Sequence, residues 1–424
     1  MTTPRRRALL MTAVLIVGAM APGAAFGAQG GPAPAGPVAT EFPPAVPVVD
    51  GWYGASVAID GDRFLVGAPY DDWTDGNTTH YAVGSLWMYT DTGAAWSGTQ
   101  FLPPFWQDGD DSYSHFAESI DIDGDTFVAG AWAADGNVAQ SGTAWVYRYT
   151  GSWDPSELKA SDGAPLDWFG KSVAVSGDRV VVGAPGSDGD EEAGALYVFD
   201  YDGGNWSETK LSVTGAAAGD RLGLGNSGVA ATSDGAVVVA GVPQGYPYGG
   251  SGAGTGRVHV FTDNAGWSQQ VLTPSGVSID DAFGWSVAVD GSRMVVGAPG
   301  DDARGSASGS VYVFEKSGGT WLQTKKLLAF DGAAGDVYGW SVAVSGDRIA
   351  VGARGNGTGT IYWYTGSGDT WNSIDPDSPQ FDSPTGLGSD VDVDGNRIVA
   401  GAPYHNGSGV EDSGTAYLLE FMYC

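Results

Sequence analysis

The sequence predicts an all-β fold, a seven-bladed β-propeller with four antiparallel strands in each blade. Three observations support this prediction: a motif that returns seven times, four strand-like segments within each copy, and no amphipathic helical pattern after the N-terminal segment. One small four-stranded sheet cannot bury both of its faces alone. Sheets packed radially around a common axis cover one another's faces, which is the propeller arrangement.

The repeated motif is Gly-Ala-Pro, or a variant of it, preceded by an apolar run. Clear copies end at Pro69, Pro185, Pro299 and Pro403, and degenerate copies fill the gaps between them. Successive copies lie between 49 residues (352 to 401) and 63 residues (67 to 130) apart, which indicates loops of variable length. The first glycine of each copy is Gly67, Gly130, Gly183, Gly241, Gly297, Gly352 or Gly401.

The third copy shows the four strands of one blade. Lys171–Val175 alternates in polarity, and Ser176–Asp178 form a tight turn because glycine tolerates positive φ and aspartate bonds its own backbone. The run Arg179–Pro185 is β-branched and nearly continuous, as expected for a strand buried on both faces. Two further segments have strand length and composition, namely Ala195–Tyr201 and Asn205–Val213.

The ring is expected to close through its N-terminal segment. The seventh copy has no fourth strand-like segment before Cys424. Residues Thr40–Pro44 resemble Thr99–Pro104, which end the fourth strand of the first copy. We therefore expect residues near Val38–Pro43 to form the outer strand of blade seven, which removes an open sheet edge.

The charge of the chain excludes some partners. It has 50 acidic and 19 basic residues, for a net charge of −31. Nucleic-acid binders need a basic face, so nucleic acid is not an expected partner, and anionic membranes are disfavoured as well. The acids are spread over all blades, as on a solvated surface, and are compatible with cation binding or a basic partner. The single cysteine excludes an intrachain disulfide.

The N-terminal segment predicts export. Three arginines, Arg5–Arg7, precede an apolar run and then small residues, so residues 1–28 are predicted to be a secretory signal peptide. The arginines leave either the general or the twin-arginine export route open. Residues 29–37 form a flexible Gly/Pro/Ala leader, and residues 38–424 form the propeller. We expect a secreted or extracellular protein, with cell-surface association as an option, and no membrane span after signal cleavage.

The repeat resembles a known family. Phe-Gly, then Val-Ala-Val, then Gly-Ala-Pro is similar to the FG-GAP repeat, with the first pair clearest at Phe169-Gly170, Phe283-Gly284 and Tyr338-Gly339. Over roughly residues 38–424 the chain resembles the N-terminal seven-bladed propeller of integrin α subunits and, more closely, bacterial secreted FG-GAP proteins. The resemblance implies the propeller fold. It implies little about activity, because function depends on sites carried by a fold.

The calcium loop of integrin-type blades is missing here. The resemblance would place that loop between the two halves of the repeat, where this chain has three-residue turns such as Asp60–Asp62 and Asp123–Asp125. Calcium takes six to eight oxygen ligands from a loop that surrounds it. We therefore predict no metal and no cofactor, although calcium stays possible in the acidic loops after Gly-Ala-Pro. The arginine after each turn is expected to pair with an acid or to cover apolar surface.

Two sets of residues are candidates for ligand binding, each with a structural alternative. The first is acidic, in loops after Gly-Ala-Pro. The second is aromatic, near the Phe-Gly pairs, and suits sugar rings, although partly buried packing is the alternative. The candidates are Asp71, Asp72, Asp75, Asp301, Asp302, Trp168, Trp285, Tyr338 and Trp340.

Two further sets that recur at fixed positions are predicted to be structural. Acids three residues before the Phe-Gly glycine should bond backbone amides between blades. Tryptophans before the fourth strand should pack between blades. The acids are Asp167, Asp220, Asp281 and Asp336, and the tryptophans are Trp96, Trp153, Trp206, Trp267, Trp321 and Trp371.

The sequence favours a binding protein over an enzyme. Its four histidines lie in different blades, and no metalloprotease or nucleophile-elbow motif occurs. No catalytic residue is predicted. The expected function is a secreted, non-enzymatic scaffold for protein–protein interaction or adhesion through propeller-face loops. A carbohydrate-binding propeller and a polysaccharide or ester hydrolase are the alternatives, so the partner is an extracellular protein or a glycan.

Overall fold

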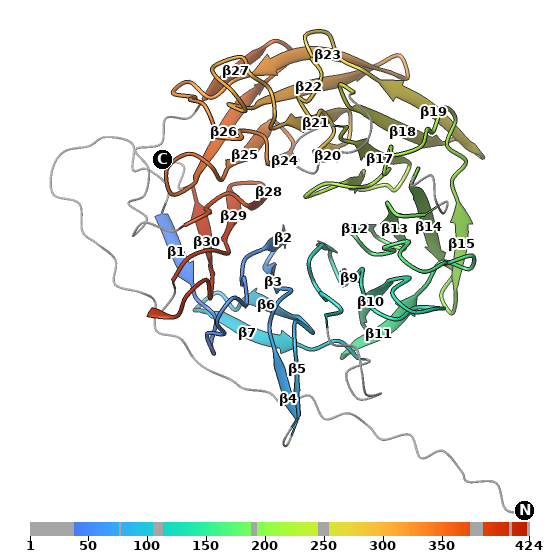
Figure 1. Ribbon diagram of the computed structural model, residues 1–424, viewed down its shortest axis with the longest axis vertical. Coiled ribbons are helices and arrows are strands. Elements are labelled where there is room, and N and C mark those ends of the chain that lie inside the picture. Colours follow the sequence, from blue (N-terminus) through green and yellow to red (C-terminus); the bar gives the residue numbers. More distant parts are fainter. Residues whose placement is uncertain are drawn as a thin grey trace, which may run out of the picture.

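Seven four-stranded antiparallel sheets stand around a central axis in the computed structural model (Figure 1). The structure describes residues 38–75, 78–104, 113–187, 193–244, 254–373, 385–406 and 409–421. The predicted signal peptide and leader, residues 1–37, lie outside these ranges. The predicted seven-bladed propeller is confirmed, and the described residues contain no α-helix.

Each blade runs outward from an inner strand, and the first four blades use strands β2 to β19. Blade 1 contains β2 (Ser56–Asp60), β3 (Arg63–Ala68), β6 (Ser85–Asp91) and β7 (Trp96–Phe101). Blade 2 contains β8 (Ile120–Asp123), β9 (Thr126–Ala131), β10 (Thr143–Tyr149) and β11 (Trp153–Leu158). Blade 3 contains β12 (Ser172–Ser176), β13 (Arg179–Ala184), β14 (Ala195–Tyr201) and β15 (Trp206–Lys210). Blade 4 contains β16 (Val229–Ala231), β17 (Val237–Val242), β18 (Arg257–Asp263) and β19 (Trp267–Leu272).

The last three blades complete the ring. Blade 5 contains β20 (Ser286–Asp290), β21 (Arg293–Ala298), β22 (Ser310–Ser317) and β23 (Thr320–Leu327). Blade 6 contains β24 (Ser341–Ser345), β25 (Arg348–Ala353), β26 (Thr360–Ser367) and β27 (Thr370–Ser373). Blade 7 contains β28 (Asp390–Asp394), β29 (Arg397–Ala402), β30 (Thr415–Glu420) and the N-terminal β1 (Val38–Phe42).

The N-terminal strand supplies the outer strand of blade 7, in agreement with the sequence. In this sheet β1 pairs antiparallel with β30, from Val38 opposite Glu420 to Phe42 opposite Ala416. The buried Phe42 ring packs on Phe64 of blade 1, with 4.9 Å between ring centroids. The closing strand therefore also helps to join blade 7 to blade 1.

The glycines of the repeat allow neighbouring blades to approach closely. A Cβ atom added to Gly401 of blade 7 would lie 1.8 Å from the carbonyl oxygen of Gly54 in blade 1. The same overlap occurs between Gly130 and the carbonyl of Gly170, at 1.9 Å. Because no side chain fits there, the first glycine of Gly-Ala-Pro recurs where it meets the next blade's Phe-Gly segment.

Carboxylates along the inner strands join neighbouring blades. The inner strands contact one another in order around the ring. Asp390, Asp392 and Asp394 of β28 accept hydrogen bonds from the backbone N–H groups of Val57 (2.9 Å), Ile59 (2.7 Å) and Gly61 (2.9 Å). Asp121 and Asp123 of β8 accept in the same way from Val175 (2.7 Å) and Gly177 (2.6 Å). These bonds satisfy N–H groups along the open edges of β2 and β12 and in the turns that follow them.

Arginines join the blades near the tight turns. The guanidinium of Arg63 in blade 1 lies 5.5 Å from the ring centroid of Trp153 in blade 2, and it donates to the Gly124 carbonyl at 2.9 Å. Three more arginines lie over a tryptophan of the next blade: Arg179 over Trp267, Arg293 over Trp371 and Arg397 over Trp96. The prediction that these arginines cover apolar surface or pair with acids is confirmed, as is the packing role of the tryptophans.

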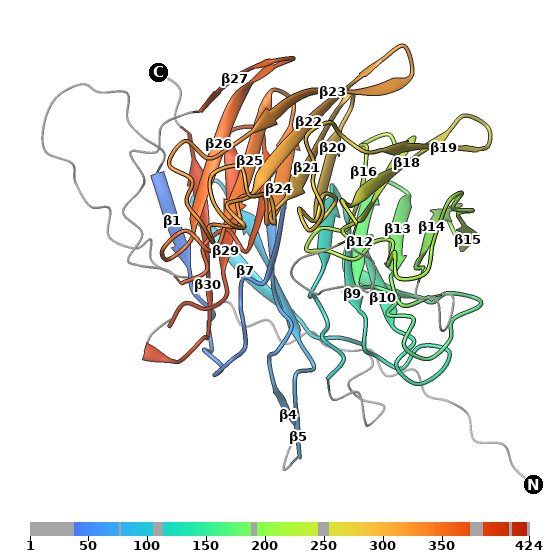
Figure 2. The ribbon, with the colours of Figure 1, turned by 45° about the horizontal axis from the view of Figure 1, so that its top comes forward.

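The two faces of the ring differ in their connections. We call one the turn face, formed by tight turns such as Gly61–Asp62 between β2 and β3. The other is the loop face, formed by the longer connections after Gly-Ala-Pro and by the links between blades, such as Trp52–Gly54. The hairpin of β4 (Trp73–Asp75) and β5 (Thr78–His80) extends from the loop face of blade 1 (Figure 2).

Candidate binding face

The residue before each Phe-Gly-type pair has a left-handed backbone on the loop face. In blades 1 to 4 this residue is large: Trp52 (φ 53°), His115 (φ 54°), Trp168 (φ 59°) and Arg221 (φ 52°). In blades 5 to 7 it is Ala282, Val337 or Gly386, with φ of 56°, 51° and 77°. Every blade has this left-handed backbone conformation, so it is a feature of the repeat itself. Only blades 1 to 4 have a large side chain at this position.

Six half-buried rings on the loop face form a continuous row of contacts, which we call the aromatic arc. Its members are Tyr404, Trp52, Tyr70, His115, Trp132 and Trp168. Between successive ring centroids the distances in this order are 5.2, 4.4, 4.7, 5.0 and 5.7 Å. The arc crosses blades 7, 1, 2 and 3, and in each blade its rings lie beside the Phe-Gly or Gly-Ala-Pro segments.

An ion pair lies beneath the middle of the arc. The Lys171 ammonium donates to Glu118 Oε1 at 2.5 Å and lies 4.5 Å from the Trp132 ring centroid, while the Trp132 indole N–H donates to Glu118 Oε2. Burial alone would raise the pKa of Glu118, but Lys171 and the Trp132 hydrogen bond lower it below its usual value. Burial lowers the pKa of His115, so its imidazole is neutral at neutral pH.

Cations also lie at the two ends of the arc. The guanidinium of Arg354 lies 3.4 Å from the Trp340 ring centroid and donates to Tyr404 Oη at 3.1 Å. The guanidinium of Arg221 lies 6.0 Å from the Trp168 ring centroid. Three basic side chains, Lys171, Arg221 and Arg354, therefore lie along the arc.

Three of the four aromatic candidates are buried. Trp285 and Trp340 are 3% and 4% exposed, and their centroids lie 4.7 Å apart. They fill the space beside the small Ala282 and Val337 of their own blades. Tyr338 is fully buried and donates to Tyr364 Oη at 2.9 Å. These rings pack in the interior and do not form the expected rim, whereas Trp168 belongs to the aromatic arc.

The acidic candidates hold loops together. In blade 1, Asp71 Oδ2 accepts from the Ser85 hydroxyl at 2.5 Å, and Asp72 Oδ1 accepts from the Ala82 N–H at 2.9 Å. Blade 5 repeats both contacts, from Ser310 to Asp301 and from Ala307 to Asp302, at 2.9 and 2.8 Å. Burial raises the pKa of Asp71 to about 7. Asp75 lies in β4, and its side chain lies outside the described residues.

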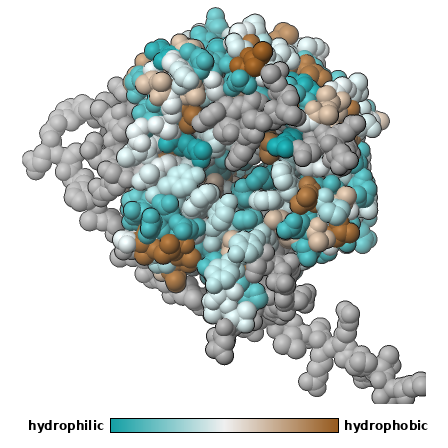
Figure 3. Space-filling view, in the orientation of Figure 1, coloured by the Kyte–Doolittle hydropathy of each residue, from teal (hydrophilic) through white to brown (hydrophobic). Residues whose placement is uncertain are grey.

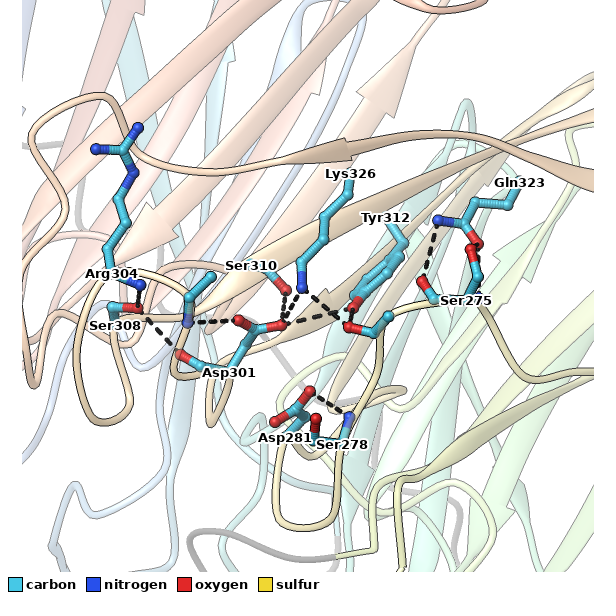
Figure 4. Close-up of polar contacts among 12 residues, drawn as sticks. Ser275, Ser278, Asp281, Asp301, Arg304, Ser308, Ser310, Tyr312, Gln323 and Lys326 are labelled. Atoms are coloured by element: carbon cyan, nitrogen blue, oxygen red, sulfur yellow. Dashed lines mark hydrogen bonds and ion pairs between the residues drawn. The ribbon is translucent and has the colours of Figure 1, made fainter.

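Asp301 is the centre of a polar cluster between blades 4 and 5 (Figure 4). It is 3% exposed and accepts from the Ala303 N–H at 2.8 Å and from the Lys326 ammonium. Lys326 also donates to the Gly276 carbonyl at 3.1 Å.

The acids before Phe-Gly have the structural role that the sequence predicts. Asp281, near this cluster, accepts from the Ser278 N–H at 2.7 Å. The other three do the same: Asp167, Asp220 and Asp336 accept from Ala164, Ala217 and Ala333.

The tight turns do not fit a calcium ion. The Asp60 carboxylate accepts from the Gly124 N–H at 2.6 Å, and the Arg63 guanidinium lies 2.9 Å from Asp125. Within the described ranges, no group of three or more His, Cys, Asp or Glu side chains is arranged to hold a metal ion.

Sequence reasoning missed most of the aromatic arc. Trp168 was a candidate, and Tyr404 begins the variable stretch Tyr404–Gly409, which the sequence also suggests for the rim. The other four rings flank Phe-Gly or follow Gly-Ala in the repeat and were not singled out: Trp52, Tyr70, His115 and Trp132. Two features of the sequence could have indicated these rings. One is the large residue before the Phe-Gly-type pair in blades 1 to 3. The other is the aromatic residue that replaces or follows the proline of Gly-Ala-Pro in blades 1, 2 and 7. Seen from the side that carries β4 and β5, the surface around the middle of the ring is mostly white to teal, and brown residues lie in small separate groups (Figure 3).

Comparison with known proteins identifies the repeat. A family model described as FG-GAP repeat matches residues 154–199, 267–314 and 321–364. These segments cover parts of blades 2 to 6. A comparison with curated proteins finds no relative. Within the part of the chain that the structure describes, no helix is long and apolar enough to cross a membrane.

Proposed function

The chain is an FG-GAP repeat β-propeller protein, and from this premise we propose that it is a non-enzymatic protein that binds an extracellular partner through its loop face. The observation that carries the proposal is the aromatic arc, a row of half-buried rings with charged groups beside them. Aromatic side chains with one accessible edge are enriched at binding sites, because they offer large contact areas at low entropic cost.

The other face of the ring has a different use. On the turn face, Arg63, Arg179 and Arg397 bond carbonyls of the next blade and pair with its acids. These guanidinium groups and acids already bond one another between blades. A ligand that bound them would have to break those contacts. The aromatic arc lies on the opposite, loop face of the ring. The predicted signal peptide, residues 1–28, supports a partner outside the cytoplasm.

The proposal is tested by blocking one face at a time. A single cysteine is placed on the loop face by Tyr81→Cys or on the turn face by Asp347→Cys, with Cys424→Ser in both variants. Tyr81 and Asp347 are both exposed, and Asp347 lies in the turn between β24 and β25. Each protein is coupled to a bulky polyethylene-glycol maleimide, and its binding to intact cells and isolated cell envelopes of the producing organism is measured.

We expect the label at position 81 to abolish binding and the label at position 347 to leave it unchanged. The unlabelled cysteine variants serve as controls for the substitutions themselves. Equal binding by both labelled proteins would refute the use of the loop face, and no binding by the unmodified protein would refute the binding function.

A further inference from the structure

We propose that the aromatic arc is a binding site for an uncharged polysaccharide chain. The inference rests on the proposed function and names the ligand class of the same face. Tyr404, Trp52, Tyr70, His115, Trp132 and Trp168 would form the platform on which successive sugar rings lie. Four features of the arc favour this ligand class: its shape, the large rings it carries, the polar groups beside it and its charge.

The shape of the arc suits an extended ligand. Its ring centroids follow one another at 4.4 to 5.7 Å across four blades. All six rings are half-buried, so part of each stays accessible. The Trp132 ring is stacked on His115 and has the Lys171 ammonium over it, so stacking with sugars falls mainly to the other rings of the arc. The C–H groups on one side of a sugar ring carry partial positive charge and are attracted to the negative face of an aromatic ring. A row of such platforms matches a chain of sugars better than a single compact molecule.

The backbone under the arc is strained without a structural need for large side chains. Trp52, His115 and Trp168 have left-handed φ values of 53°, 54° and 59°. Blade 7 has glycine at the equivalent position, Gly386, and glycine adopts this conformation without a steric penalty. Non-glycine residues persist in such conformations when the surrounding structure holds them, and they cluster at functional sites. The same conformation occurs at Arg221, Ala282 and Val337, so it does not mark the site by itself; the large ring that blades 1 to 3 carry at this position on the loop face is what distinguishes them.

Polar groups beside the rings suit sugar hydroxyls. Glu118 offers a carboxylate that accepts hydrogen bonds, and the half-buried Lys171 and Arg354 offer donors next to Trp132 and Tyr404. A hydroxyl both donates and accepts, so it can bond either kind of group. Ligand sites commonly combine apolar and aromatic lining with a few fixed polar groups of this kind.

The charges favour an uncharged polymer. Lys171 lies over Trp132, Arg221 lies near the Trp168 ring and Arg354 bonds Tyr404 Oη, so a cationic ligand on the arc would meet protein cations there. A net charge of −31 repels an acidic polysaccharide at long range. An uncharged chain avoids both penalties.

The test is affinity electrophoresis in native gels that contain a soluble polysaccharide. The uncharged probes are β-1,3-glucan, hydroxyethylcellulose, galactomannan and glycol chitin, and alginate is the acidic probe. Three proteins are compared with the unmodified chain: Trp52→Ala, Trp132→Phe and the control Trp371→Ala. Trp371 is also half-buried and lies beside a cation, Arg293, but on the turn face. Thermal melting establishes that each variant is folded.

We expect retardation by at least one uncharged probe, a loss of roughly tenfold in affinity for Trp52→Ala, and unchanged affinity for Trp371→Ala. Trp132→Phe keeps a ring without the indole N–H and is expected to retain most of the affinity. Retardation by none of the uncharged probes, retardation by alginate alone, or equal affinity of Trp52→Ala and the unmodified chain would each overturn the proposal. If cell binding were still blocked by the label at position 81, the proposed function would stand and only the ligand class would fail.

Discussion

At the scale of single residues, repetition separates structural side chains from those available for function. The acids of the inner strands bond the next blade's backbone, and those before Phe-Gly bond their own loops, so most conspicuous carboxylates are occupied. The aromatic arc, by contrast, uses positions where the blades differ from one another. In a repeat protein, variation between copies is the better indication of a binding site, because packing demands are shared by every copy.

The inner-strand acids predict an unusual pH dependence of stability. Burial raises the pKa of Asp121 and Asp390 to about 8 and that of Asp392 to about 7. The unfolded chain releases these protons near pH 4, so between about pH 4 and pH 8 the folded state binds more protons than the unfolded state. The free energy of unfolding should therefore fall as pH rises through this window and level off above it. Thermal melting from pH 5 to pH 9 checks this and should show a melting temperature lower by several degrees at the alkaline end.

Asp392→Asn provides the comparison for this prediction. The amide cannot ionise, so the variant should lose less stability between pH 5 and pH 8 than the unmodified protein. Its Oδ1 can still accept one of the two backbone N–H groups that Asp392 bonds, those of Ile59 and Val393. A melting temperature that rises with pH in both proteins would contradict the assignment of these shifts.

At the scale of elements, the sequence predicts strands well where both faces are buried. The predicted segment Ala195–Tyr201 coincides with β14, and the predicted closing strand near Val38–Pro43 corresponds to β1. The prediction is less accurate for the exposed outer strand. The segment predicted at Asn205–Val213 forms β15 only over Trp206–Lys210. A buried strand needs apolar residues along its whole length, whereas an edge strand ends wherever its partner's pairing ends.

The candidate site could not be predicted to the same extent, because its contacts join different blades. Trp52 and Tyr404 meet only because blade 7 closes against blade 1. The burial of Trp285 depends on its contact with Trp340 of the next blade. Among the described residues, the hairpin of β4 and β5 has no counterpart in the other copies, and the repeat pattern gave no indication of it.

The packing of the closing strand β1 predicts that one substitution in it lowers the stability of the protein strongly. Phe42 contacts Phe64 and Tyr89 with both centroids at 4.9 Å, and it is 6% exposed. Phe42→Ala should lower the free energy of unfolding by about 3–5 kcal/mol, as expected for a buried phenylalanine that leaves a cavity. Chemical denaturation followed by tryptophan fluorescence measures this change.

Val38→Ala is the matched control, because Val38 belongs to the same strand but is 47% exposed. Its free energy of unfolding should stay within about 0.5 kcal/mol of the unmodified protein. An equally small effect of Phe42→Ala would mean that β1 does not contribute to closing the ring.

At the scale of the whole molecule, blade 4 reaches across the middle of the ring. Its link between Leu222 and β16 is longer than the corresponding link of blade 3, and Asn226 in it donates to Asp390 Oδ1 of blade 7 at 2.9 Å. The backbone N–H of Asn226 also bonds the Trp285 carbonyl of blade 5 at 3.1 Å. Three blades therefore meet around one residue, Asn226. The centre of the ring is thus a structural junction beside the candidate binding face.

The net charge predicts that salt stabilises the folded ring. With 50 acidic and 19 basic residues, repulsion between acids outweighs the attraction in the ion pairs between blades. The screening length shrinks from roughly 30 Å at 0.01 M salt to about 8 Å at 0.15 M, so the repulsion that opposes folding should weaken. We expect the melting temperature to rise by several degrees between 0.01 and 0.5 M NaCl, and a fall would contradict the prediction.

KCl and CaCl₂ at matched ionic strength distinguish screening from the binding of a specific ion. Equal melting temperatures in the two salts indicate screening alone. A much larger rise in CaCl₂ would instead indicate a divalent-ion site in the acidic loops and would reverse the expectation that the chain binds no metal.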